Sequence, residues 1–323
     1  MLKNSFLRGF LVGVIAILAI AAYFIWRAPS TRPAGAPQAA PAPAPAPARP
    51  ASLTTPAATA PAVPVPATAS VQSADCASPA WNGAAAANKA SLYTLAWSPF
   101  GKAETGWATY VPLISREIGA HCPADSPGFA AAWSRWQAAH GFAADGIVKP
   151  PGFERLRDIL ALRRPFVKAS AKGACPAAPD PAALATASPS ESFGGKTILL
   201  RPGALAAYRR MVAAARAAGV AARPPLFQLV SGFRGPAEEA SRCAGGGCNT
   251  LTRASCSAHR TGLAFDLYLD PLPGADPTST DEANRRHMSA SVEYRWLVAN
   301  ASRFGFLPYA YEPWHWEWTG EGI

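Results

Sequence analysis

The sequence lacks several patterns that would assign it to common functional classes. It has no Gly-x-Ser-x-Gly segment, so the nucleophile elbow of the serine hydrolases is excluded. Charged residues make up only 15% of the chain, and no short stretch interleaves basic with aromatic side chains. The formal net charge of +10 therefore does not predict a nucleic-acid partner. It suits a surface that lies near anionic polymers or lipids.

Residues 10–26 contain no charged or strongly polar side chain. This length is closer to a membrane-spanning helix than to the shorter apolar core of a cleaved signal peptide, which is the alternative. Lys3 and Arg8 precede the segment, so we expect its N-terminal side to face the cytoplasm. Residues 1–27 are thus predicted to be a single-pass anchor in the inner (cytoplasmic) membrane. Everything after Arg27 would then lie on the periplasmic, extracytoplasmic side.

Residues 28–75 lack apolar periodicity and consist almost entirely of Pro, Ala, Thr and Ser. Such a segment cannot bury a core, and we expect a disordered, semi-rigid linker. The rest of the chain is long enough for one large or two small domains. All six cysteines lie in this exported part, so disulfides are expected, although the sequence does not choose among the pairings.

We interpret the rest as two domains, residues 76–165 and 166–323. In the first, apolar residues recur at helical spacing, and Gly141 and Asp145-Gly146 mark a helix end and a turn. With Trp136 and Phe153, this stretch resembles the small helical peptidoglycan-binding module found beside cell-wall hydrolases. The alternative is a helical packing subdomain that binds no ligand.

The second region mixes helical and strand patterns. Residues 202–219 predict an amphipathic helix, residues 226–231 a buried strand, and residues 263–269 a strand with one buried face. A further helix is expected over residues 289–304, and a last strand over residues 314–318. This order predicts an α+β domain around an antiparallel sheet.

Two short segments concentrate side chains that can bind metal. Residues 257–266 read SAHRTGLAFD, and residues 312–317 read EPWHWE. A hydrolytic zinc site uses three protein ligands, built from His nitrogen and carboxylate oxygen, and leaves one position open. His259, Asp266 and His315 supply this set.

The alternation of side chains along the two strands supports this set. Asp266 lies opposite the apolar side of its strand, whereas His315 and Glu317 share the side opposite the tryptophans of the last strand. Two adjacent strands could therefore direct Asp266 and His315 into one cleft.

Both segments resemble the D-alanyl-D-alanine carboxypeptidases of the VanY type. These belong to a wider zinc metallopeptidase group that includes D-Ala-D-Ala dipeptidases and the hedgehog fold. The family motifs Ser-x-His-x-x-Gly-x-Ala-x-Asp and Glu-x-x-His match at every defined position. The resemblance spans roughly residues 196–320. It implies that Zn²⁺ is bound by His259, Asp266 and His315, with Glu312 as the catalytic base.

The resemblance also implies contacts with the substrate. The segment Ser231-Gly-Phe-Arg234 is similar to the family's Ser-Gly-Tyr-Arg, which implies that Arg234 binds the scissile carbonyl. Ser257 corresponds to a family residue near the terminal carboxylate of the substrate, and we add Trp314 to the substrate-binding set. Where the family usually has Gln, this chain has Glu239, a further candidate contact that would alter how the substrate backbone is held.

The implied reaction is zinc-dependent hydrolysis of the terminal D-Ala-D-Ala bond of peptidoglycan stem peptides. Stem peptides and the cytoplasmic membrane are then the expected partners. An insertion over residues 243–256 precedes the His259 loop and is expected to shape the rim of the cleft. Two alternatives remain open: an endopeptidase of the same fold, and a zinc-containing wall-binding protein without catalysis. The presence of both Glu312 and Arg234 argues against the second.

Overall fold

The computed structural model describes residues 76–171, 173–249, 251 and 254–322. The predicted membrane anchor and the Pro/Ala-rich linker lie outside the described residues. Within the described part of the chain, no helix is both long and apolar enough to cross a membrane. All of these residues lie in one compact unit, Val65–Ile323.

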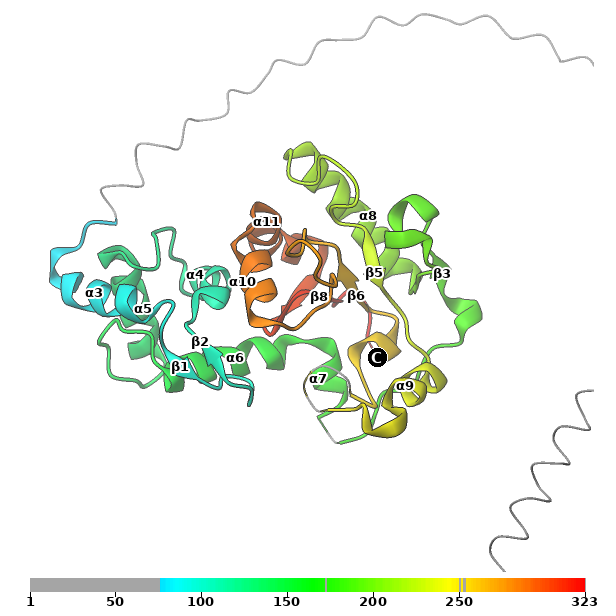
Figure 1. The fold of residues 1–323 in the computed structure, drawn as a ribbon, viewed down its shortest axis with the longest axis horizontal. Coiled ribbons are helices and arrows are strands. Elements are labelled where there is room, and N and C mark those ends of the chain that lie inside the picture. Colours follow the sequence, from blue (N-terminus) through cyan, green and yellow to red (C-terminus); the bar gives the residue numbers. More distant parts are fainter. Residues whose placement is uncertain (1–75, 172, 250, 252–253, 323) are drawn as a thin grey trace, which may run out of the picture. The chain divides into compact units, whose positions relative to one another are not determined.

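Helices and short strands alternate along the described chain (Figure 1). The α-helices are α3 Asn82–Ser91, α4 Val111–Ile118, α5 Pro127–Ala139, α6 Pro150–Arg163, α7 Pro165–Ala169, α8 Pro202–Ala217, α9 Pro236–Cys243, α10 Glu282–Ala290 and α11 Val292–Asn300. The 3-10 helices are η1 Pro79–Trp81, η2 Ala108–Tyr110, η3 Pro181–Ala183, η4 Pro189–Glu191, η5 Phe193–Gly195, η6 Ala244–Gly246, η7 Ala258–Thr261 and η8 Ala301–Phe304. The strands are β1 Ala96–Trp97, β2 Glu104–Thr105, β3 Ala185–Thr186, β4 Leu199–Leu200, β5 Leu229–Ser231, β6 Ala264–Leu267, β7 Phe306–Tyr309 and β8 Glu312–Trp318.

The region from α3 to α6 is helical, as the periodicity predicts, and it closes on an aromatic core. Ser126 begins α5, because its side-chain oxygen accepts a hydrogen bond from the Phe129 N–H at 3.2 Å. The helix ends before Gly141, which has a φ of +77°. Gly146, with a φ of +71°, forms the predicted turn, where an added Cβ would meet the Ala130 carbonyl oxygen at 2.8 Å. Only glycine fits that turn without a shift of the backbone.

The second region is built on a four-stranded antiparallel sheet with the order β5-β6-β8-β7. The predicted α+β class and the antiparallel sheet are therefore confirmed. The ladder between β6 and β8 places Asp266 directly opposite His315. On the other side of β6, Ser231 lies opposite Asp266. The register of three strands thus brings these residues together.

Two strands are shorter than predicted. Instead of residues 263–269 with one buried face, β6 spans Ala264–Leu267, and all of its side chains are buried. This strand lies between β5 and β8, and its polar side faces a cluster that is itself buried. The predicted strand 226–231 is reduced to β5, because Phe227 has a φ of 64° and so cannot continue an extended ladder.

The helix predicted over residues 289–304 begins later than expected. It corresponds to α11, Val292–Asn300, followed by η8, whereas residues 289 and 290 are the end of α10. Ser291 lies between α10 and α11 in an extended conformation, and its side chain accepts a hydrogen bond from the Tyr294 N–H at 3.1 Å. This cap starts a new helix directly after the end of α10.

The helical region and the sheet region pack against each other, and some side chains contact the cores of both. Phe100 and Leu160 pack against both hydrophobic cores. Two buried arginines also make ion pairs there, Arg285 with Glu104 and Arg164 with Glu317. The domain boundary predicted near residue 165 stays a prediction.

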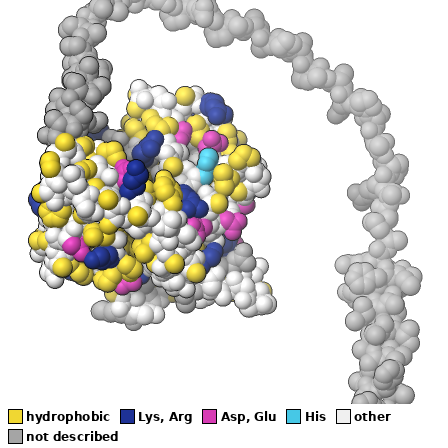
Figure 2. Space-filling view, turned by 60° about the vertical axis from the view of Figure 1, so that its left-hand side comes forward, with side chains coloured by type: hydrophobic (Ala, Val, Ile, Leu, Met, Phe, Trp, Pro, Cys, Tyr) yellow, Lys and Arg dark blue, Asp and Glu magenta, His cyan; other side chains and the backbone are white. Residues whose placement is uncertain are grey.

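Charged side chains on the face drawn in Figure 2 are spread among hydrophobic ones, and basic side chains alternate with acidic ones. The basic side chains on that face therefore do not form a single stripe. Such a distribution gives a weaker local field than a cluster of like charges.

Candidate metal centre and cleft

A cleft of about 750 Å³ lies beside the polar side of β6 and β8. Its lining contains seven of the side chains predicted to form the site: Arg234, Ser257, His259, Asp266, Glu312, Trp314 and His315. The lining also includes Arg164, Lys196, Arg242 and Tyr309, none of which is predicted from the sequence. The cleft is therefore rich in cationic groups around a small anionic centre.

One ligand atom from each of His259, Asp266 and His315 lies within 4.8 Å of the other two. The Asp266 Oδ1 atom is 3.0 Å from His315 Nδ1 and 3.3 Å from His259 Nε2. All three side chains are buried. Two imidazole nitrogens and one carboxylate oxygen therefore converge, which is the donor set of a hydrolytic zinc site.

Local structure fixes the His259 ring. His259 lies in η7, which ends at Gly262 with a φ of +69°. The His259 Nδ1 atom is 2.7 Å from the Gly232 carbonyl oxygen, and only a protonated nitrogen can donate to that acceptor. In the neutral ring, the lone pair is then on Nε2, the atom that faces Asp266.

The Asp266 carboxylate is oriented by its second oxygen. Its Oδ2 atom accepts a hydrogen bond from the Ser231 hydroxyl at 2.9 Å. Ser231 Oγ in turn accepts one from the Arg234 guanidinium at 2.9 Å. Because Ser231 and Arg234 hold Oδ2, the Oδ1 atom is directed toward the two histidines.

These residues fit a bound cation. Burial, and then the charge of Arg234, lower the pKa of His259 to about 4, so the ring is neutral at pH 7. The pKa of Asp266 lies well below its ordinary value, because His259 and His315 outweigh the opposite effect of burial. A nitrogen lone pair therefore faces a carboxylate oxygen at 3.3 Å, an arrangement that a cation between the two atoms stabilises.

His315 has a different environment. Burial lowers its pKa, but the nearby carboxylates of Asp266 and Glu317 outweigh burial and raise it to about 9 in the metal-free protein. Metal binding must therefore displace a proton from this ring, so affinity is expected to fall as the pH decreases.

Glu312 is the first residue of β8 and lies on the cleft beside this cluster. The pairing of β7 with β8 shifts register between Pro308 and Tyr309, so that Tyr309 lies opposite Glu312. Burial raises the pKa of Glu312 to about 7, a value suited to a general base at neutral pH. A cation bound nearby would lower that pKa again.

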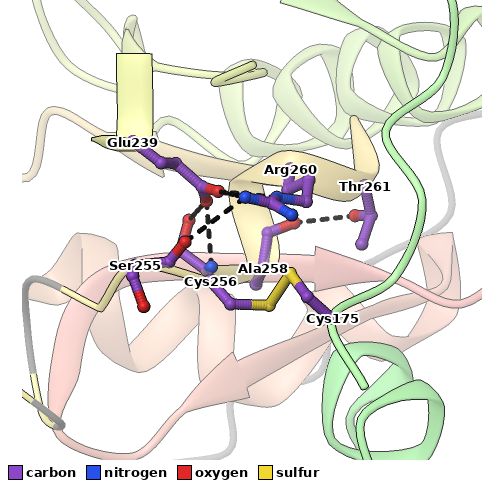
Figure 3. Close-up of a disulfide and its surroundings, with 8 residues drawn as sticks. Cys175, Glu239, Ser255, Cys256, Ala258, Arg260 and Thr261 are labelled. Atoms are coloured by element: carbon purple, nitrogen blue, oxygen red, sulfur yellow. Dashed lines mark hydrogen bonds and ion pairs between the residues drawn. A yellow bond between two sulfur atoms is a disulfide. The ribbon is translucent and has the colours of Figure 1, made fainter. Parts of the chain in front are cut away.

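Glu239 does not line the cleft. Its side chain is 2% exposed, and one carboxylate oxygen accepts hydrogen bonds from the Ser257 N–H at 2.9 Å and from the Ser257 hydroxyl at 2.7 Å. The other oxygen accepts from Arg260 Nε at 2.6 Å, and Figure 3 shows these two side chains pointing toward each other. Glu239 therefore orients Ser257, while its predicted direct contact with substrate stays a prediction.

Three disulfides are present among the described residues: Cys76–Cys122, Cys175–Cys256 and Cys243–Cys248. The expectation that the cysteines form disulfides is confirmed. Cys175–Cys256 fixes the residue directly before Ser257 to a segment 81 positions earlier in the chain (Figure 3). It therefore limits the movement of one side of the cleft.

The sequence of the region that forms the cleft also matches a known protein family. Residues 197–321 match the family described as VanY, D-alanyl-D-alanine carboxypeptidase. This match makes the C-terminal part of the chain similar to the VanY family. The matched residues include every predicted ligand and catalytic residue, whereas Arg164 lies before them. The resemblance inferred from the sequence motifs is thereby confirmed.

Among solved structures, the chain is similar to DacB from Streptococcus pneumoniae D39, with 23% sequence identity. That alignment covers 42% of this chain and 72% of the DacB chain, with a TM-score of 0.24. No curated protein matches the chain.

Proposed function

We propose that this protein is a zinc-dependent carboxypeptidase that removes the terminal D-alanine from peptidoglycan stem peptides. The observation that carries the proposal is the convergence of His259, Asp266 and His315 in a cleft that also holds Glu312 and Arg234. The VanY match supports the substrate class. The disulfides suit an oxidising extracytoplasmic compartment, and the apolar N-terminal segment would tether the enzyme to the inner membrane.

In this proposal His259, Asp266 and His315 hold Zn²⁺. When bound, zinc supplies a Lewis acid that polarises a carbonyl group and makes water more acidic. Glu312 accepts the proton from the attacking water, because its carboxylate lies on the cleft beside the three ligands. The same carboxyl group then donates that proton to the departing amine of D-alanine.

Arg234 lies beside the cluster, next to Ser231 and Asp266. It lies in the cleft and is already anchored to Ser231, so its remaining N–H groups can donate to the carbonyl oxygen of the scissile bond. A preorganised donor of this kind contributes about 3–4 kcal/mol in well-studied hydrolases. Ser257, held by Glu239, would contact the substrate near its terminal carboxylate.

The test is release of free D-alanine from a pentapeptide wall precursor by the full-length protein, with and without a chelator. Glu312→Gln should retain zinc and lose about 10²–10⁴-fold in kcat, because it removes a base and keeps the ligands. Glu154→Gln, at an exposed position on α6, is the matched control and should leave kcat unchanged.

Two results would contradict the proposed reaction. Cleavage inside cross-linked stems without free D-alanine would identify an endopeptidase. Equal inertness of the wild type and Glu312→Gln, with both proteins retained on isolated sacculi, would identify a wall-binding protein.

A further inference from the structure

Each candidate ligand histidine has one ring nitrogen that faces Asp266 and a second, outer nitrogen that points away from it. The two histidines differ in the hydrogen bonding of this outer nitrogen. The outer nitrogen of His259, Nδ1, has the Gly232 carbonyl oxygen at 2.7 Å. The outer nitrogen of His315 is Nε2, because its Nδ1 faces Asp266. This buried Nε2 has no hydrogen-bond partner within ordinary distance among the described residues. The acceptor that faces it is Glu317 Oε1, at 3.6 Å.

Glu317 is itself rigidly held. Its side chain is 2% exposed, and its Oε1 atom accepts a hydrogen bond from Arg164 Nε at 2.6 Å. Its Oε2 atom accepts one from the Phe166 N–H at 3.1 Å. The Arg164 guanidinium lies 4.1 Å from the centre of the Tyr309 ring, so the cation is held as well as the carboxylate.

This arrangement has a chemical consequence for His315. When a histidine binds a metal through one nitrogen, an acceptor near the other nitrogen fixes the tautomer and the orientation of the ring. A carboxylate facing Nε2 favours the proton on that atom and leaves the lone pair on Nδ1, the atom that faces Asp266 Oδ1 at 3.0 Å. Because Glu317 is held in place, a small movement of the His315 ring converts the 3.6 Å separation into a hydrogen bond.

We propose that Glu317 is a positioning residue for the metal centre. Its carboxylate, fixed by the ion pair with Arg164, orients the His315 ring so that Nδ1 binds the cation. The proposal rests on the proposed metal site and not on the identity of the substrate. Arg164 follows α6 and precedes the residues that match the VanY family, so the segment next to the helical region contributes to the metal centre through Glu317. This segment then has a role in the site whether or not the helical region binds the cell wall.

The decisive variant removes both charges at once. Arg164→Met/Glu317→Met replaces a buried ion pair with apolar side chains, an exchange that is often neutral or stabilising for the fold. We expect the metal-free double variant to melt within a few degrees of the wild type. Its affinity for Zn²⁺, measured by competition with a chromophoric chelator, should fall about 10–100-fold.

The ion pair of the preceding residue, the last of α6, supplies a matched control. Arg163 pairs with Glu117 at 2.6 Å, and the Arg163 side chain is 47% exposed. Arg163→Met/Glu117→Met should retain the Zn²⁺ affinity of the wild type. The variant Arg164→Met/Glu317→Gln restores a hydrogen-bond acceptor without its charge. It should recover most of the lost affinity, whereas a purely structural role predicts equal affinities for the Gln and Met versions.

Unchanged Zn²⁺ affinity in a folded Arg164→Met/Glu317→Met protein would overturn the proposal. If that variant does not fold, the ¹⁵N-histidine spectrum of the zinc-loaded wild type decides. The signals that disappear in His315→Ala should show a proton on Nε2 and a metal-bound Nδ1, and the reverse assignment would contradict the proposal. A wild type that binds no zinc would instead refute the proposed function.

Discussion

Arg285 donates from Nε to the main-chain carbonyl oxygen of Tyr311, 2.7 Å away and directly before Glu312 in the chain. The guanidinium is buried, and its other nitrogens are 3.0 Å from Glu104 Oε1 and 2.7 Å from the Tyr110 hydroxyl. Glu104 and Tyr110 both belong to the helical region. The start of β8, where Glu312 lies, is therefore held by a buried polar network from that region.

We expect Arg285→Ala to lower the free energy of unfolding by about 3–5 kcal/mol, because it leaves the Glu104 carboxylate buried without its partner. Denaturant unfolding measures this loss. Arg286→Ala is the control at the next position, where the side chain is 34% exposed and pairs with Glu282 at 3.5 Å. It should change stability by less than about 1 kcal/mol, and equal losses in the two variants would contradict the assigned role of Arg285.

Removal of metal should destabilise the fold as well as stop turnover. At a Zn²⁺ concentration about 100 times the dissociation constant, binding stabilises the native state by about 2.7 kcal/mol. A chelator should therefore lower the melting temperature by about 5–10 °C. His259→Ala should melt at the same temperature with and without the chelator, whereas His287→Ala, outside the cluster, should behave like the wild type.

The two disulfides near the cleft should differ in their contribution to stability. Cys175–Cys256 joins residues 81 positions apart, whereas Cys243–Cys248 joins residues 5 apart. In the chain-entropy account, replacing the first pair with Ser should cost about 4–5 kcal/mol and replacing the second about 2 kcal/mol. Loss of the first should also raise KM, because Cys256 precedes Ser257. Equal midpoints of unfolding for the two double variants would contradict this ranking.

Glu191 should contribute to stability in a pH-dependent way. Hydrogen bonds from Arg209 lower the pKa of Glu191 from 4.5 to about 2 in the folded protein. A lowered pKa means that the contribution is fully present above about pH 4.5 and is lost as the pH falls toward 2. The stability difference between the wild type and Glu191→Gln should therefore shrink between pH 5 and pH 3.

The difference in free energy of unfolding between the wild type and Glu191→Gln should not exceed about 1 kcal/mol. The Arg209 side chain is half exposed, so water screens the ion pair. Glu154→Gln, at its exposed position, should show no such trend in the same urea titrations. A difference for Glu191→Gln that grows as the pH falls would contradict the prediction.

The sequence by itself determined the candidate ligand set and the class of fold. The spacings within residues 257–266 and 312–317 are local, and alternation along β8 places His315 and Glu317 on the same side. The structure brings His259, Asp266 and His315 together as these patterns predict. Helix ends were accurate where glycine has a positive φ, as at Gly219 after α8, since that conformation strongly favours glycine.

Only the tertiary structure decided which distant residues meet at the site. Arg164 and Glu317 are 153 positions apart, and Glu104 and Arg285 are 181 apart, so no periodicity within either segment encodes their contact. The pairing of the cysteines and the orientation of Glu239 toward Ser257 depend in the same way on how loops pack against each other. Local patterns specify which side of a strand a residue occupies. Its partner across the fold is set by the packing of separate elements, a property of the whole chain.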